Sequence, residues 1–224
     1  AEGDEKLAKK VLLAYAELAA RQGDFHRVLA MLERLERIVT GEGDRPEEHK
    51  VLLFRAQAHA ALGDRAAALS AIDRATALLP DDEAASCERY KFAALVDYFG
   101  RDFRSAAARA EQAIDKARSL GLMYEVAVNL HNLGDFLIRL DDYPRAYGAI
   151  RQSLDLSQEG GFDRLVHHDR MYVAFLDGIA GDPRAEERLQ TAIEYAEDHD
   201  FTWDSLNGRV LLGTLLRRIR WPFE

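Results

Sequence analysis

Few side chains in this sequence have the type and spacing that a chemical site requires. His167 and His168 are followed by Asp169, a set whose ring nitrogens and carboxylate could bind a metal ion. In a helix, however, adjacent residues point about 100° apart, so the two imidazoles would diverge. The alternative is that one histidine faces a binding groove and the other the surface. We therefore expect no metal site and no cofactor.

Two further candidates have structural explanations. The acidic run Asp81-Asp82-Glu83 follows Pro80, where a helix is predicted to begin, so capping and the helix dipole explain it. The single cysteine, Cys87, has no partner for an internal disulfide and is predicted to be a small packing residue near Tyr90. The sequence has no phosphate-binding loop, no Gly-x-Ser-x-Gly turn and no His-Glu-x-x-His motif. We expect no catalytic residues and no enzyme activity.

The composition limits the class of partner. The 224 residues are 48% hydrophobic and 31% charged, which is too apolar for a disordered chain. A formal net charge of −9 disfavours nucleic acid and anionic membranes as partners. The best candidate for a membrane span, Val11 to Ala20, is interrupted by Glu17 and is shorter than the roughly 20 residues required. Together with the lone cysteine, this predicts a cytoplasmic protein. Because the chain begins at Ala1, we expect it to be processed or to be part of a longer protein.

An internal repeat supplies the elements that must position any site. A turn motif with a central Asp recurs at steps of 40, 38, 40 and 40 residues, at Asp24, Asp64, Asp102, Asp142 and Asp182. In three of the five motifs a Gly precedes the Asp. Gly can adopt the left-handed conformation that ends a helix, and Asp accepts hydrogen bonds from the N–H groups that open the next one. The motif therefore predicts five helix–turn–helix units.

Small residues follow each turn. Ala68, Ala106 and Ala146 lie on the predicted inner stripe of three second helices, where they would allow paired helices to approach closely. Breakers are predicted to end second helices at Pro80, Gly121 and Gly160-Gly161. The sequence thus predicts pairs of helices that pack side by side.

These residues resemble the tetratricopeptide repeat family, whose pattern has Leu-Gly in the first helix, Gly-Asp-Tyr at the turn, and Ala, an apolar residue, Ala and Pro along the second. The fourth repeat matches best, with Leu133-Gly134, Asp142-Tyr143, Ala146 and Ile150. The resemblance covers about Leu7 to Ile219. It implies an all-α fold, a right-handed superhelix of five helix–turn–helix repeats plus a terminal helix, in a single domain over residues 1–224. The predicted repeats are 7–46, 47–84, 85–124, 125–164 and 165–202, and the terminal helix is 204–220.

The period of 38 to 40 residues exceeds the family's usual 34. This longer form is similar to the repeat arrays in regulatory regions of bacterial signalling proteins, including serine/threonine kinases and large transcription activators. The run from Asn129 to Asp135 is typical of such arrays. The resemblance therefore implies a regulatory module.

The resemblance also implies that the first helices line a concave groove that binds a protein or peptide. The positions that face inward in the family correspond here to Phe54, Phe92, Phe99, His131, Asn132, Asp135, Tyr172 and Phe175. Aromatic residues supply large contact areas at interfaces. The alternative is that individual aromatics are core residues between helices, because an error of one residue rotates a side chain by about 100°.

Asn132 is the sharpest candidate in this set. Peptide-binding members of the family often carry an Asn at this position, and an amide can both donate to and accept from a peptide backbone. The alternative is a solvated polar residue on a helix. Members that clamp a chaperone's terminal carboxylate have an inward Lys beside the Asn, whereas this chain has His131. Binding of a chaperone tail is therefore not expected.

The sequence as a whole predicts a non-catalytic protein- or peptide-binding module of a larger bacterial signalling protein. One alternative is an oligomerisation or scaffolding module, with self-association or a neighbouring domain filling the groove. Another is an enzyme whose site is assembled from groove side chains, although the sequence shows no closely paired ionisable groups. We expect no nucleic acid and no membrane partner.

Overall fold

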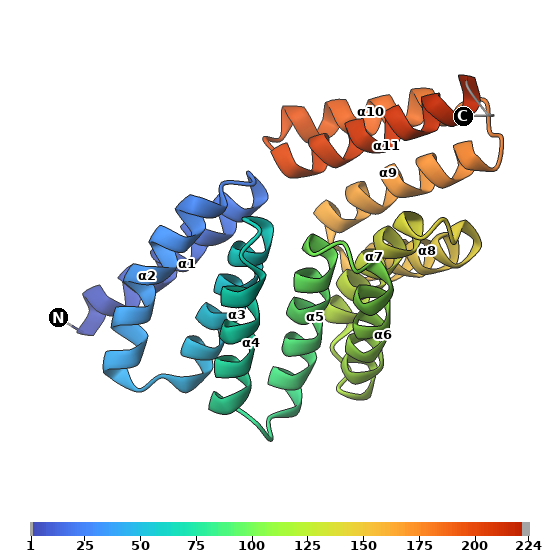
Figure 1. Cartoon of the computed structure of the whole chain (residues 1–224). Coiled ribbons are helices and arrows are strands. Elements are labelled where there is room, and N and C mark those ends of the chain that lie inside the picture. The colour runs from blue at the N-terminus through green and yellow to red at the C-terminus, as the bar shows by residue number, and fades with distance from the viewer. Residues whose placement is uncertain (1, 221–224) are drawn as a thin grey trace. The chain divides into compact units, whose positions relative to one another are not determined.

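The computed structural model describes residues 2–220, and the side chains in that range other than those of residues 2–6, 21, 40–42 and 220. The described residues form eleven α-helices and no strand (Figure 1). In chain order these are α1 (Glu2–Arg21), α2 (Phe25–Glu42), α3 (Arg45–Ala61), α4 (Arg65–Leu78), α5 (Glu83–Phe99), α6 (Phe103–Ser119), α7 (Met123–Arg139), α8 (Tyr143–Gly160), α9 (Asp163–Ile179), α10 (Ala185–Asp198) and α11 (Thr202–Arg220).

The helices pack in consecutive pairs. Each of α1, α3, α5, α7 and α9 contacts the helix that follows it, and α11 contacts α9 and α10. This confirms the predicted all-α fold of five helix pairs and a further helix. The handedness and path of the whole array stay predictions. Within residues 2–220, no helix combines the length and apolar character needed to cross a membrane.

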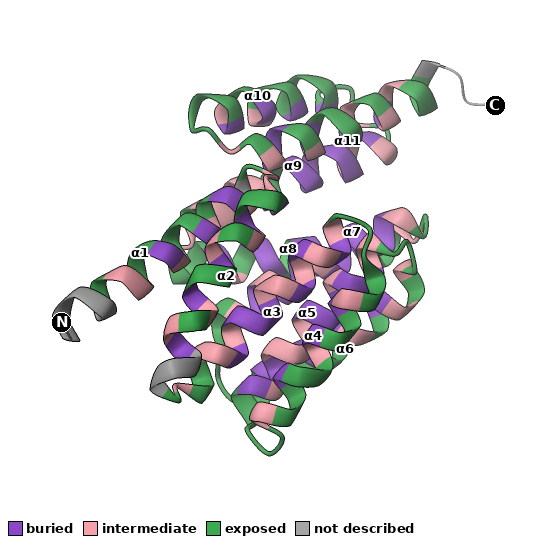
Figure 2. Cartoon of the chain, turned by 60° about the vertical axis from the view of Figure 1, so that its left-hand side comes forward, coloured by how far each residue is buried: buried purple, intermediate pink, exposed green. Residues whose placement is uncertain are grey.

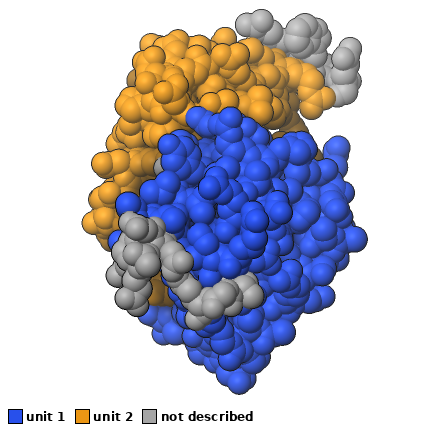
Figure 3. Space-filling view, turned by 90° about the vertical axis from the view of Figure 1, so that its left-hand side faces the viewer, with its two compact units in different colours: residues 1–121 blue, residues 122–224 orange. Residues whose placement is uncertain are grey.

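The chain forms two compact units, residues 1–121 (unit 1) and 122–224 (unit 2), coloured separately in Figure 3. Unit 1 contains α1 to α6 and unit 2 contains α7 to α11. The boundary follows Gly121, which has a φ of 68°, and lies three residues before the predicted junction at 124 and 125. The single domain over residues 1–224 stays a prediction.

The predicted Asp turns are confirmed at all five positions. In each turn an Asp Oδ1 accepts a hydrogen bond from a backbone N–H two or three residues on, over 2.9 to 3.4 Å. Asp82 does the same at the start of α5, where it accepts from the Ala85 N–H over 2.8 Å. The acidic run before α5 is therefore a helix start, as predicted.

The residue before each turn Asp has a left-handed backbone. Gly23, Gly63 and Gly181 have φ values of 74°, 85° and 98°. At the same place in the third and fourth repeats, Arg101 and Asp141 have φ values of 61° and 59°. The conformation thus belongs to the turn, even where a side chain makes it less favourable.

The predicted close contacts between paired helices are also confirmed. Ala68, Ala106 and Ala146 are fully buried. A Cβ added to Gly134 would lie 2.4 Å from Cδ1 of Ile150, so α7 and α8 meet closely at this glycine. Figure 2 shows the buried residues along stripes of the helices, with exposed residues between them.

Candidate binding faces of the first helices

The aromatic side chains predicted in unit 1 lie on α3 and α5. The rings of Phe54 and Phe92 meet edge to face, with centroids 5.3 Å apart and an interplanar angle of 74°. The Lys91 ammonium lies 5.4 Å from the Phe92 centroid. Phe54 is half-buried, while Phe92 packs with Leu52 and other buried residues. The pair joins two first helices and leaves part of one ring exposed.

Phe99 lies near the end of α5. Its ring contacts those of Phe25 and Tyr98, with centroids 5.9 and 5.4 Å away. It is half-buried and packs against the cluster that includes Ala68 and Val96. Phe99 therefore lies at the edge of the unit 1 core.

Three of the aromatics predicted to face an open groove are instead core residues. Phe92, Tyr172 and Phe175 have exposed fractions of 6%, 1% and 0%. Tyr172 packs against the rings of His131 and His168, and Phe175 contacts Tyr143. The predicted orientation is wrong because a first helix is covered on several sides: α9 contacts α7, α8, α10 and α11.

In unit 2, polar side chains from three helices form a buried cluster. His131 on α7 places Nδ1 2.7 Å from Oδ1 of Asp169 on α9. The other carboxylate oxygen, Oδ2, accepts a hydrogen bond from the Ser153 hydroxyl of α8 over 2.7 Å. Ser153 Oγ is also 2.9 Å from the carbonyl oxygen of Ala127. The carboxylate thus links the first helices of two repeats.

The pKa values of the two histidines of this region are shifted in opposite directions. Burial lowers the pKa of His131, but the hydrogen bond and charge of Asp169, with Asp135 and Asp204 farther off, leave it raised overall. Burial, the charge of His131 and that of Arg164 hold the pKa of His168 well below its usual value. The two ring centroids are 4.2 Å apart. A ring with a raised pKa therefore lies against one whose pKa is lowered.

Two of the three polar residues predicted to contact a ligand are engaged within the protein. His131 and Asp135 are buried, with exposed fractions of 6% and 7%. His131 pairs with Asp169, and Asp135 lies 3.4 Å from the Arg139 guanidinium. The prediction that both residues face a ligand is wrong, because each completes an ion pair inside unit 2. Asn132 is half-buried, and no described residue hydrogen-bonds to its side chain.

The cluster lacks the arrangement of a catalytic triad. In a triad the imidazole lies between the hydroxyl and the carboxylate. Here the carboxylate of Asp169 lies between Ser153 and His131, and the hydroxyl is fully buried. The chemistry that this geometry supports is ion pairing.

The adjacent histidines of α9 diverge, as predicted. His167 stacks on Tyr195 of α10, with centroids 3.7 Å apart, while His168 faces His131 of α7. Among the residues that the structure describes, no group of three or more His, Cys, Asp or Glu side chains could hold a metal ion.

Two ionic residues were missed as structural centres in the sequence. In the sequence, Asp169 belongs to a motif that suggests a metal site, and Asp97 belongs to no recognisable motif. Asp97 is buried between the guanidinium groups of Arg65 and Arg109, at 2.9 and 2.7 Å. The available signal was an acidic residue within an apolar first helix. It gives no indication of the partner, because the partners lie 12 to 38 residues away.

The chain is similar in fold to several solved structures, while no protein-family model and no curated protein matches it. One is a Signal Transduction ATPase with Numerous Domains (STAND) protein with a tetratricopeptide repeat sensor, from Pyrococcus horikoshii (TM-score 0.66, 16% identity, covering 94% of this chain). Another is aspartyl phosphate phosphatase F from Bacillus subtilis (TM-score 0.67, 14% identity, covering 96%). A third is the apo form of RapI (TM-score 0.65, 11% identity, covering 92%).

At these identities the likeness shows the fold, a tetratricopeptide-like helical repeat. The chain spans 34% of the STAND protein, 59% of phosphatase F and 77% of RapI. The longer period of the repeat is not tested by these matches.

Proposed function

We propose that the chain is a non-catalytic module that binds a protein or peptide through the first-helix face around Asn132. The supporting observation is the half-buried amide of Asn132, which has no hydrogen-bond partner among the described residues. Its neighbours His131 and Asp135 are fixed by their own ion pairs. An amide that can both donate and accept suits the backbone of an extended segment. Leaving it unpaired under a ligand would cost about 1–3 kcal/mol.

The module is proposed to be a regulatory part of a larger bacterial signalling protein in the cytoplasm. The STAND protein is described as having a tetratricopeptide repeat sensor, and the likeness is confined to a third of its length. This supports a repeat region that acts as one part of a signalling chain. The repeat spacing near 40 residues agrees with such a region.

The test is selection of peptides from a random library against the full chain, followed by measured affinities. Asn132→Ala should weaken binding of the selected peptides by about 5-fold, the equivalent of one net hydrogen bond of about 1 kcal/mol. Gln158→Ala, a polar truncation at an exposed position of α8, is the control and should leave affinity unchanged. Circular dichroism should show the same helicity in both variants.

Three outcomes would contradict the proposal. Equal affinity of wild type and Asn132→Ala would remove this face as the site. Turnover of a selected peptide would indicate an enzyme. A concentration-dependent solution mass that Asn132→Ala lowers would indicate that another copy of the chain fills this face.

A further inference from the structure

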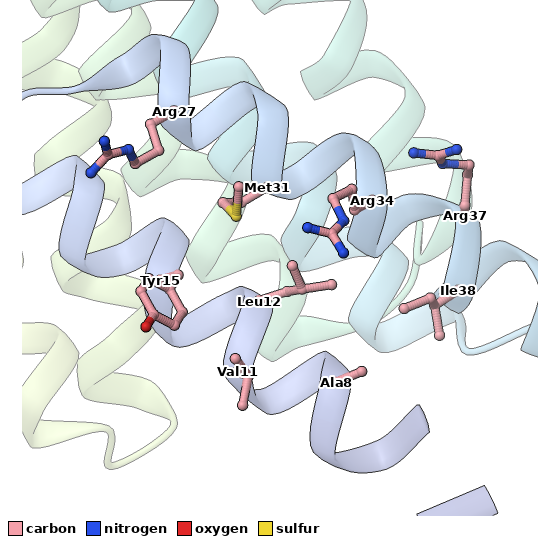
Figure 4. Close-up of a pocket in the computed structure, with 9 residues that line it drawn as sticks. All are labelled: Ala8, Val11, Leu12, Tyr15, Arg27, Met31, Arg34, Arg37 and Ile38. Atoms are coloured by element: carbon pink, nitrogen blue, oxygen red, sulfur yellow. The ribbon is translucent and has the colours of Figure 1, made fainter. Parts of the chain in front are cut away.

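A groove lies between α1 and α2 in unit 1, and none of its lining residues is among those that the sequence predicted to bind. Its volume is about 770 Å³. Figure 4 shows the side chains of both helices that line it: Ala8, Val11, Leu12 and Tyr15 from α1, and Arg27, Met31, Arg34, Arg37 and Ile38 from α2. The volume falls within the range of about 300–1,000 Å³ that is typical of binding sites.

One wall of the groove continues into an exposed apolar stripe on α1. Leu7, Val11, Ala14 and Leu18 are all exposed and follow one another at spacings of four, three and four residues. Tyr15 lies beside them and is 56% exposed. This spacing is the one through which a helix packs along a second helix. A helix face of this kind in contact with water is a candidate interface.

The opposite wall is apolar at its base and basic along its edge. Met31 and Ile38 of α2 line the groove together with three arginines, Arg27, Arg34 and Arg37, which are all exposed. Arg27 forms an ion pair with Asp24, at 3.5 Å. No described residue forms an ion pair with Arg34 or Arg37. A basic row of this kind contrasts with the chain's net charge of −9.

A second copy of this chain is the less suitable occupant. Two copies that met through this face would bring their arginine rows together, which is unfavourable. The acidic helix α10 buries its own apolar residues within unit 2.

We propose that this groove binds an acidic amphipathic helix of a partner protein. Its apolar side chains would pack on the α1 stripe and on Met31, while its Asp or Glu side chains would pair with Arg34 and Arg37. The stripe from Leu7 to Leu18 is about 16 Å long at 1.5 Å per residue, so it matches about three helical turns. This groove shares no lining residue with the face around Asn132, so the two proposals can be tested independently.

The test uses two synthetic helical peptides of about 14 residues. They share the same row of leucines along one face and differ only in having Glu or Lys beside that row. Binding to the full chain is followed by fluorescence anisotropy at low and high salt. The Glu peptide should bind at least about 10-fold more tightly than the Lys peptide, and salt should reduce that difference. The double variant Arg34→Glu/Arg37→Glu should reverse the preference. Val11→Asp should weaken both peptides.

Matched controls separate this site from the rest of the surface. Arg151→Glu makes the same type of charge change, from Arg to Glu, at an exposed position of α8. It should leave the preference for the Glu peptide over the Lys peptide unchanged. Asn132→Ala should also leave it unchanged, because it belongs to the other proposed site. The positions substituted in α1, α2 and α8 are exposed, so circular dichroism should show full helicity in those variants.

Equal binding of the Glu and Lys peptides, or no binding of either, would overturn the proposal. A preference that survives in Arg34→Glu/Arg37→Glu would overturn it as well. If the chain dimerises in solution and Val11→Asp makes it monomeric, the occupant is a second copy and not an acidic helix.

Discussion

Each unit contains a buried carboxylate that links neighbouring helices, and the two carboxylates are neutralised in different ways. In unit 1, Asp97 lies between the guanidinium groups of Arg65 and Arg109. In unit 2, Asp169 lies between the His131 imidazole and the Ser153 hydroxyl. Both are acceptors in a helix core, yet one is paired with permanent charges and the other with a group that titrates near neutral pH.

The difference extends to the exposure of the partners. The Arg65 and Arg109 side chains are 47% and 43% exposed, so water can solvate them if Asp97 is lost. The His131 side chain is only 8% exposed and has no such alternative. A buried carboxylate between helices therefore forms a contact in unit 1 whose partners remain solvated if the carboxylate is lost. The corresponding contact in unit 2 depends on both of its partners.

Asp169→Asn should have the largest effect on stability. It leaves the buried His131 ring opposite an uncharged amide, and breaking a buried pair in this way costs about 3–5 kcal/mol. Denaturant unfolding measures the loss, and native-state hydrogen exchange should place it in α7, α8 and α9. A loss below about 1 kcal/mol would show that His131 is not charged in the folded protein.

Asp97→Asn is the matched change in unit 1 and should cost less, about 2 kcal/mol, because its two arginines remain solvated and one amide oxygen can still accept. Hydrogen exchange should increase in α4, α5 and α6. If this variant were destabilised as much as Asp169→Asn, exposure of the partners would not be what distinguishes the two units.

Replacing a buried alanine should affect the two units equally. Ala106→Leu in unit 1 and Ala146→Leu in unit 2 each add volume where paired helices touch, at a cost of about 1–3 kcal/mol. Ala108→Leu, at an exposed position of the same helix as Ala106, is the control and should be nearly neutral. An unchanged denaturation midpoint for Ala106→Leu would contradict the tight packing of α5 on α6.

The features predicted correctly from the sequence depend on residues close together in the chain. Asp64 caps the helix that begins at the next residue. Ala106 lies at a fixed number of residues after the Asp of its own turn. The predicted orientations of Tyr172 and Phe175 failed because they depend on how several helices surround α9. The pairing of His131 with Asp169 spans 38 residues and leaves no local signal. The Leu7 to Leu18 stripe resembles a core-facing pattern and shows its exposure only in the structure.

The smallest expected effect is a change in how stability depends on pH, and it is specific to unit 2. The pKa of His131 is raised in the folded protein, so its contribution is complete below about pH 6.5 and is lost as the pH rises through the folded-state pKa. The pKa of His168 is lowered, so its contribution is complete above about pH 6.5 and is lost as the pH falls toward the folded-state pKa. In the wild type the two contributions therefore act on opposite sides of pH 6.5.

Removing one histidine at a time should separate these slopes. In His168→Gln, the free energy of unfolding should still fall as the pH rises above 6.5, but its fall below pH 6.5 should be abolished, because Gln does not titrate. In His131→Gln the fall above pH 6.5 should be abolished, while a fall below pH 6.5 remains because burial and the charge of Arg164 still disfavour a proton on His168. Asp97→Asn should leave the slope above pH 6.5 unchanged, since the arginines beside it stay charged throughout. Parallel curves for all three variants and the wild type would show that the protonation states of the two buried imidazoles do not differ between the folded and unfolded chain.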